Sequence, residues 1–187
     1  MKKRRIVSAL VLFLSIVFVS SVEAIPIVSI DNYEVVIGDI FSVDVWISNV
    51  DPALPVAGFE FDIDYDPTIL TPLSIVDGGY LPSPLGIPPF VVESDLNPPD
   101  INFAMTTIGW GGGSGSGILA TITFQGTNIG ASPLDLNDVI LAAPGGTPIT
   151  PVTLNDGSVN VTPEPATFLL IGSGIIGIFG LKRKKII

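Results

Sequence analysis

Apolar and polar residues alternate with a period of two along two stretches of the chain. In the first stretch the apolar members are Phe41, Val43, Val45 and Ile47, and the members between them are Ser42, Asp44, Trp46 and Ser48. In the second stretch the apolar members are Phe59, Phe61, Ile63 and Tyr65, separated by Glu60, Asp62 and Asp64. Successive side chains of a β-strand point to opposite faces, so each stretch predicts a strand with one buried and one solvent-facing side. On this pattern Trp46 faces outward.

Shorter apolar runs, separated by Gly, Pro, Asn and Asp, predict seven further strands, at 27–30, 33–37, 73–76, 101–107, 118–124, 134–141 and 158–161. In one of these strands we expect four side chains to face the same way, those of Ile118, Ala120, Ile122 and Phe124. Residues 80–99 are rich in proline and 109–117 in glycine, which predicts an extended surface connection and a flexible loop. About nine strands at regular spacing predict an all-β jelly-roll β-sandwich.

The N-terminus has the three parts of a secretory signal peptide. A basic run at 2–5 precedes an apolar run at 6–19, and small residues flank Glu23 in Val22-Glu23-Ala24. This order predicts a signal peptide over 1–24 that is cleaved after Ala24, with an uncleaved anchor as the alternative.

The C-terminus has a different three-part order, over residues 163–187. Pro163-Glu164-Pro165 is biased toward extended structure, which suits a segment that lies in a protease groove. The uncharged apolar stretch 166–181 predicts a transmembrane helix, which at sixteen residues reaches about 24 Å, slightly short of a hydrocarbon core of about 30 Å. The basic run at 182–185 is expected to stay in the cytoplasm under the positive-inside bias.

This order resembles the PEP-CTERM sorting signal of bacterial exported proteins. The resemblance implies that an exosortase, a membrane transpeptidase-like protease, processes the chain near Pro163, Glu164 and Pro165. It also implies export through the inner membrane, transient anchoring by the C-terminal helix, and a final place at the cell surface or in the extracellular matrix. A plain membrane anchor without processing is the alternative.

Charge is distributed unevenly between the ends and the middle of the chain. All eight basic residues lie in the two terminal segments, whereas residues 25–162 hold sixteen acids and no Lys or Arg. Such a domain repels nucleic acid and anionic membranes, and it forms no internal salt bridge between side chains. Its 138 residues are enough for one sandwich-sized core.

The composition also restricts catalysis. The chain has no Cys and no His, which excludes thiol nucleophiles, disulfides, Cys/His zinc sites and Ser-His-Asp triads. Only paired carboxylates remain, as in glycoside hydrolysis, and no motif singles out one pair. We therefore expect no enzyme, with a carboxylate-based glycoside hydrolase as a remote alternative.

Residues 56–70 contain Tyr65-Asp66-Pro67 followed by Leu70, and this segment resembles the cohesin signature Tyr-Asp-Pro-x-x-Leu. Residues 117–124 and 156–161 are similar to later cohesin segments, in the right order. The resemblance implies a nine-stranded jelly-roll sandwich related to carbohydrate-binding modules of cellulose-degrading systems. In cellulosomes such domains bind calcium-loaded dockerin modules, partly through the strand that ends at this signature. The resemblance thus places a partner surface at Gly58, Glu60, Asp62 and Asp64, although no motif in this chain specifies dockerin as the partner.

These features together predict an exported, non-enzymatic cohesin-like module that binds a protein partner, dockerin-like or other. The alternative is a carbohydrate-binding module that acts in polysaccharide binding or catabolism. Sugar binding uses flat, exposed aromatic rings, and among the four aromatic candidates, Tyr33, Trp46, Tyr80 and Trp110, we select Trp46 and Trp110. The competing interpretations are that Trp46 lies under a loop and that Trp110 merely anchors its own loop.

Acidic residues on one strand raise the question of a metal. Successive members of Glu60, Asp62 and Asp64 are about 6.6–7 Å apart, too far for direct chelation without oxygens from elsewhere. Asp135 and Asp138 form a second group of oxygens. Asp62, Asp64, Asp135 and Asp138 are therefore weak calcium candidates, and a solvated acidic face without a cofactor is the favoured interpretation.

Overall fold

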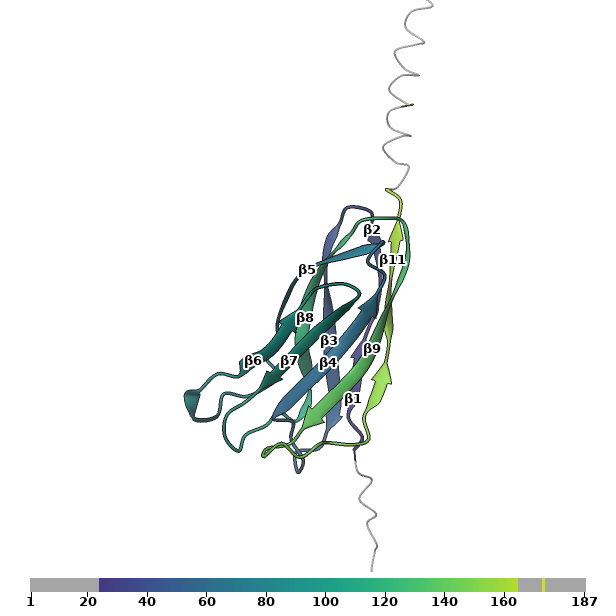
Figure 1. The fold of residues 1–187 in the computed structure, drawn as a ribbon. Coiled ribbons are helices and arrows are strands. Elements are labelled where there is room, and N and C mark those ends of the chain that lie inside the picture. Colours follow the sequence, from purple (N-terminus) through teal and green to yellow (C-terminus); the bar gives the residue numbers. More distant parts are fainter. Residues whose placement is uncertain (1–23, 165–172, 174–187) are drawn as a thin grey trace, which may run out of the picture.

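Two β-sheets packed face to face contain all eleven strands of the described chain, which comprises residues 24–164 and 173 in this computed structural model (Figure 1). The expected signal peptide, up to residue 23, lies outside the described residues. So do Pro165 and the expected transmembrane helix, apart from Ser173. Within 24–164 and at 173, no helix is long and apolar enough to cross a membrane.

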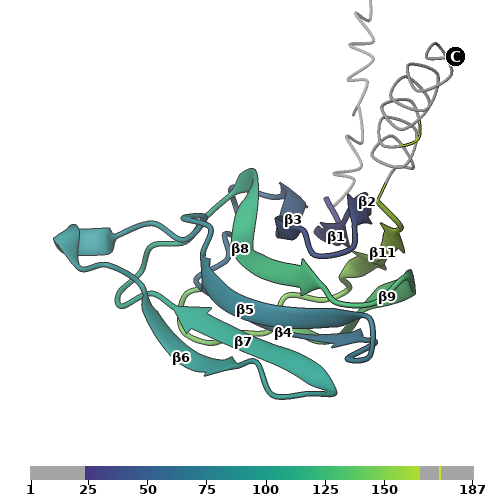
Figure 2. The ribbon, with the colours of Figure 1, turned by 90° about the horizontal axis from the view of Figure 1, so that it is seen from above.

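The strands divide between a five-stranded sheet, here called sheet A, and a six-stranded sheet, sheet B. In spatial order sheet A holds β10 (Thr153–Asn155), β1 (Ile27–Ile30), β3 (Ile40–Val50), β8 (Gly115–Gly126) and β5 (Leu70–Asp77). Sheet B holds β2 (Asn32–Val36), β11 (Gly157–Thr162), β9 (Gly130–Ala142), β4 (Gly58–Tyr65), β7 (Asp100–Thr106) and β6 (Phe90–Asp95). Figure 2 shows the two layers, with β8 and β5 in one and β4, β7 and β6 in the other. The pairs β1–β10 and β2–β11 are parallel, and the other pairs are antiparallel.

The nine expected strands are present, and the all-β sandwich is confirmed. Two more strands, β6 and β10, complete the sheets. Residues 80–99 lie mostly at the surface as expected, although Leu81 is buried in the core. Six of them form β6, which pairs with β7 alone and so ends sheet B. Prolines flank this strand rather than interrupt it, which an edge strand tolerates. A short 3-10 helix, Pro84–Gly86, precedes it and projects away from the sandwich (Figure 2).

The core lies between the sheets and consists of the inward side chains that the alternation predicted. Val43, Val45 and Ile47 of β3 are fully buried, and the four apolar side chains of β4 are at most 5% exposed. Phe124 of sheet A meets Tyr65 of sheet B edge to face at 5.9 Å between ring centroids. The outward prediction for Trp46 is confirmed, because its side chain is 38% exposed between the buried Val45 and Ile47.

A β-bulge in β8 changes the direction of one predicted core side chain. Val45 pairs with Ala120 but Trp46 pairs with Ile118, so Leu119 is an extra residue in β8. Leu119 and Ala120 are both fully buried, and Ile118 shares the outer face of sheet A with its partner Trp46. The expectation that Ile118 faces the same way as Ala120 is therefore wrong, because the bulge shifts the alternation by one residue.

The Tyr65-Asp66-Pro67 segment has a local structural role at the end of β4. The Tyr65 ring lies in the core. Asp66 Oδ1 accepts hydrogen bonds from the Thr68 amide at 2.8 Å and the Thr68 hydroxyl at 2.6 Å. The Asp66 amide donates to Ser132 Oγ at 2.8 Å. These bonds shape the turn that leads into β5, so this segment supports the fold.

Candidate functional site

The outer face of sheet B is acidic at one end. β4 lies between β7 and β9, and its outward side chains are those of Glu60, Asp62 and Asp64. Asp62 pairs with two amide residues, Asn102 of β7 and Asn137 of β9. Asp64 pairs with two carboxylate residues, Asp100 of β7 and Asp135 of β9. Asn137 Nδ2 donates a hydrogen bond to Asp64 Oδ2 at 2.8 Å. The cross-strand register thus assembles an acidic cluster from three strands that are far apart in sequence.

Partial burial and the surrounding carboxylates both shift the pKa of Asp62. Partial burial raises the pKa of Asp62, and the negative charges of Asp138, Asp100, Glu60 and Glu93 raise it further. A raised pKa means that the folded protein holds the ionised form of Asp62 less favourably than the unfolded chain does. The ionised group therefore destabilises the fold at neutral pH.

We expect the substitution Asp62→Asn to increase the free energy of unfolding at pH 7. Because the pKa of Asp62 is raised in the folded protein, ionised Asp62 lowers the free energy of unfolding at neutral pH. This destabilisation is lost as the pH falls through the raised pKa toward the ordinary value of 3.8. The advantage of the variant over the wild type should shrink over the same interval. Urea unfolding at pH 7, 5 and 3.5 measures this difference. A constant advantage at all three pH values would contradict it.

Asp66→Asn is the matched control with the opposite sign. The two hydrogen bonds from Thr68 hold the pKa of Asp66 below its ordinary value, so its ionised form stabilises the fold. That stabilisation is present above pH 3.8 and is lost as the pH falls through the lowered pKa. Asp66→Asn should therefore destabilise the protein at pH 7 and have little effect in strong acid.

The four calcium candidates share this face, with Asp62 and Asp64 on β4 and Asp135 and Asp138 on β9. Asp64 and Asp135 are direct cross-strand partners. Nevertheless, within residues 24–164 no group of three or more acidic side chains is arranged to hold a metal ion. Calcium binding stays a prediction from the sequence, without a formed ligand set behind it.

The charge balance predicts how salt affects stability. A domain with sixteen acids and no Lys or Arg repels itself, so added salt should raise its melting temperature. We expect divalent ions to raise the melting temperature most at low ionic strength. Thermal melts in sodium, magnesium and calcium chloride, matched for ionic strength, measure this effect. Equal curves in all three salts would exclude a specific metal site and leave screening alone.

The other end of the same face is apolar. A hollow of about 180 Å³ lies there, lined by Gly58, Val92, Ala104, Thr106, Ile140 and others. Ile140 is 50% exposed and Val92 is 62% exposed. A Cβ at Gly58 would lie 3.1 Å from Thr106 Oγ1, so glycine allows β7 to approach closely there.

The four residues expected to form the partner surface therefore run from the apolar end at Gly58 to the acidic end at Asp64. Sequence reasoning missed the apolar contributions of Val92 and Ile140. Val92 belongs to the unpredicted strand β6. The outward direction of Ile140 follows from the register shift between β4 and β9.

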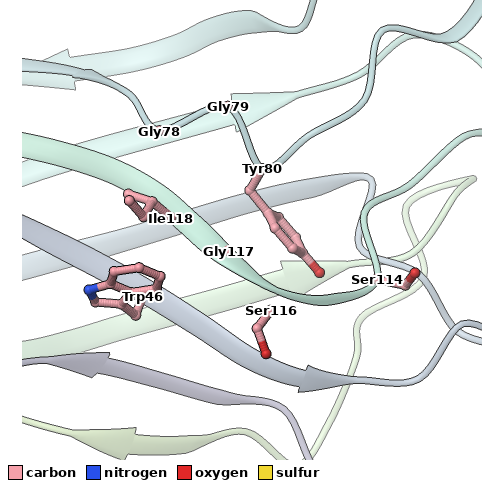
Figure 3. A pocket seen from close by; sticks show the side chains of 8 residues that line it. All are labelled: Trp46, Gly78, Gly79, Tyr80, Ser114, Ser116, Gly117 and Ile118. Carbon is pink, nitrogen blue, oxygen red and sulfur yellow. The ribbon is translucent and has the colours of Figure 1, made fainter.

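A second hollow lies on the opposite side of the sandwich, at the outer face of sheet A (Figure 3). Its volume is about 360 Å³, and the side chains around it include Trp46, Tyr80, Ser116 and Ile118. Burial raises the pKa of Tyr80 from its ordinary value of 10.0 to about 12. Trp110 does not line this hollow. Its ring is 88% exposed, so it does not anchor its loop by packing into the protein.

Several solved structures with the same fold are cohesins. A non-cellulosomal cohesin from the archaeon Archaeoglobus fulgidus is 17% identical, with 78% of this chain and 97% of that chain covered and a TM-score of 0.63. The seventh ScaB type I cohesin from Pseudobacteroides cellulosolvens is 21% identical, with coverages of 75% and 94% and a TM-score of 0.64. A chain of the Coh-OlpC-Doc435 type I cohesin–dockerin complex from Clostridium thermocellum is 16% identical, with coverages of 75% and 95% and a TM-score of 0.63. At these identities the similarity shows the shared fold.

Family models match both parts of the chain beyond the N-terminus. The model of the cohesin domain matches residues 26–161, and that of the PEP-CTERM protein-sorting motif matches residues 161–184. No curated protein matches the chain significantly. The cohesin match covers well over half of the sequence, and the tail carries a motif of export and sorting. The chain therefore belongs to the cohesin domain family and ends in a PEP-CTERM sorting motif.

Proposed function

We propose that this protein is an exported, non-enzymatic interaction module that binds a protein partner on the outer face of sheet B. The observation that carries the proposal is the division of this face into an apolar end around Ile140 and an acidic end around Asp62 and Asp64. An exposed apolar area bordered by charge is typical of protein interaction sites. The absence of Cys and His is consistent with a binding role rather than catalysis.

One further observation favours this face, and another favours a dockerin-like partner. The resemblance of residues 56–70 to the cohesin signature supports a partner surface that includes β4. Several of the solved cohesins with this fold are in complex with dockerins, including one from Clostridium thermocellum. A dockerin-like module is therefore the first class of partner to test.

Charge complementarity defines the partner more closely. The domain offers carboxylates and no cation, so a partner with Lys or Arg beside a small apolar ridge fits this face. The apolar ridge would contact Val92 and Ile140, and the basic side chains would contact Asp62 and Asp64. Such a complex should associate faster at low ionic strength, because the opposite charges steer the encounter.

The tail determines where the module acts. We propose that the signal peptide directs export, that residues 166–181 hold the chain in the inner membrane for a time, and that an exosortase then processes it near Pro163-Glu164-Pro165. Pro163 and Glu164 are exposed and directly follow β11, which keeps them accessible outside the folded domain. The product would reside at the cell surface or in the extracellular polysaccharide matrix.

Calorimetric titration with calcium-loaded dockerin modules from the same genome tests the partner proposal. The face variant is Asp62→Lys with Asp64→Lys, and the control is Asp31→Lys, an exposed acid on the connection between β1 and β2. We expect the face variant to weaken binding at least about tenfold, equal to 1.4 kcal/mol, and the control to bind like the wild type. Equal binding by all three proteins would refute this site, and hydrolysis of any polysaccharide would refute the non-enzymatic role.

A further inference from the structure

Trp46 is a large aromatic residue between small polar residues on the outward side of β3, in sheet A. The other outward side chains of β3 around it are the small polar ones of Asp44 and Ser48. Trp46 is nevertheless 38% exposed, although burial of its apolar ring would be energetically favourable. Its cross-strand partners are Ser29 of β1 and Ile118 of β8, and Ile118 is the one large side chain at these two adjacent positions.

The hollow beside Trp46 has the size of a small-molecule site. Its volume of about 360 Å³ lies within the range of about 300–1,000 Å³ that ligand pockets occupy. Ile118 and Tyr80 contribute apolar walls, and Ser114 and Ser116 contribute hydroxyl groups (Figure 3). An aromatic ring, apolar walls and hydroxyl groups therefore meet in one place.

Glycines allow close packing around this hollow. A Cβ at Gly78 would lie 2.4 Å from the Ile118 carbonyl oxygen, and one at Gly117 would lie 2.7 Å from Tyr80 Cδ2. A Cβ at Gly113 would lie 2.7 Å from Tyr80 Cε1. Tyr80 thus packs closely against the glycine-rich segment that leads into β8. Larger residues at these positions would displace the walls of the hollow.

Polar groups continue beyond the ring on the same face. Asp44 lies two residues before Trp46 and therefore points to the same side of β3. The Thr121 hydroxyl donates a hydrogen bond to Asp44 Oδ1 at 2.6 Å, which orients this carboxylate on the outer face of sheet A. A carboxylate accepts up to about four hydrogen bonds, so Asp44 keeps capacity for hydroxyl groups of a ligand.

This combination matches the chemistry of a sugar ring. A pyranose has an apolar C–H face that stacks on an aromatic ring, and hydroxyl groups at its rim that bond to carboxylates and hydroxyls. The sixteen acids of the domain repel anionic sugars. We infer that Trp46 and the hollow beside it bind one or two units of a neutral pyranose glycan. The site lies on sheet A and is independent of the protein partner proposed for sheet B.

A single-tryptophan variant tests the site directly. The chain has two tryptophans, so in Trp110→Phe the fluorescence reports on Trp46 alone. The full chain, purified in mild detergent, is titrated with cello-, manno- and galacto-oligosaccharides, with oligogalacturonate as the anionic control. We expect at least one neutral oligosaccharide to change the Trp46 emission with saturation, and oligogalacturonate to leave it unchanged. No response to any neutral oligosaccharide would overturn the inference.

A second set of variants separates stacking from folding. Calorimetry on Trp46→Ala should show an affinity at least about tenfold lower than that of the wild type. Trp46→Tyr keeps a ring and should retain part of the binding, and the exposed Trp110→Ala should bind like the wild type. Circular dichroism checks that each variant is folded. Unchanged affinity in folded Trp46→Ala, or a loss in Trp110→Ala instead, would refute the site.

Discussion

Replacement of Pro163, Glu164 and Pro165 by alanine is expected to abolish processing of the tail while leaving export intact. Proline disfavours helix and biases a segment toward extended backbone, and alanines would let this segment join the apolar helix expected at 166–181. The basic residues at 182–185 would still stop transfer, because each costs about 2.5–3.5 kcal/mol at the centre of a membrane helix. The variant should therefore remain in the inner membrane.

Mass spectrometry of the protein from cells with and without exosortase measures this effect. The wild type should lose its C-terminus only in exosortase-positive cells, and the variant should keep it in both. A matched control replaces Pro88 and Pro89, which lie in the connection before β6, and should be processed normally. If the mature wild type from exosortase-positive cells retains its C-terminus through Ile187, the tail is an ordinary anchor.

Phe124→Ala is expected to lower the free energy of unfolding by about 3–5 kcal/mol. Phe124 is fully buried between the sheets, meets Tyr65 edge to face, and stacks on Phe41 at 6.1 Å between centroids. Its removal leaves a cavity where the two sheets meet, and the rigid strands collapse only partly into it. Domains are stable by about 5–15 kcal/mol, so this loss is a large share of the total.

Urea unfolding followed by circular dichroism measures the loss. Phe90→Ala is the matched control, because Phe90 is 45% exposed on the edge strand β6. We expect the control to cost much less, since its ring is already partly in water. Equal costs for the two variants would show that Phe124 does not join the sheets as its contacts indicate.

The two proposed binding faces lie on opposite sheets. The protein-binding face is formed by β4, β7, β9 and β6, and the hollow at Trp46 by β3, β8 and the segment after β5. A partner on one face therefore leaves the other free. A module of this kind would connect a protein to a neutral polysaccharide, and binding of both ligands at once is measurable by adding the second to a saturated complex of the first.

Much of this protein followed from the sequence because strand periodicity is a local property. The alternation in 41–48 and 59–65 determined which side chains are buried in β3 and β4, and it placed Trp46 and the acids of β4 outside. The absence of Lys and Arg between residues 25 and 162 determined the charge of every face. The signature at 65–67 and the three-part tail each indicated a family, because both are short runs of contiguous residues.

Other features depend on how strands pair, which a local pattern does not contain. Because prolines flank β6, the sequence pattern did not predict this strand. Its pairing with β7 brings Val92 to the hollow near Gly58. The register shift between β4 and β9 adds Ile140 to the same hollow. The extra residue Leu119 in β8 turns Ile118 outward beside Trp46 and so forms one wall of the second hollow. Periodicity gives the two faces of each strand, but register, bulges and sheet order arise from contacts between distant segments, and those contacts decided where the candidate sites lie.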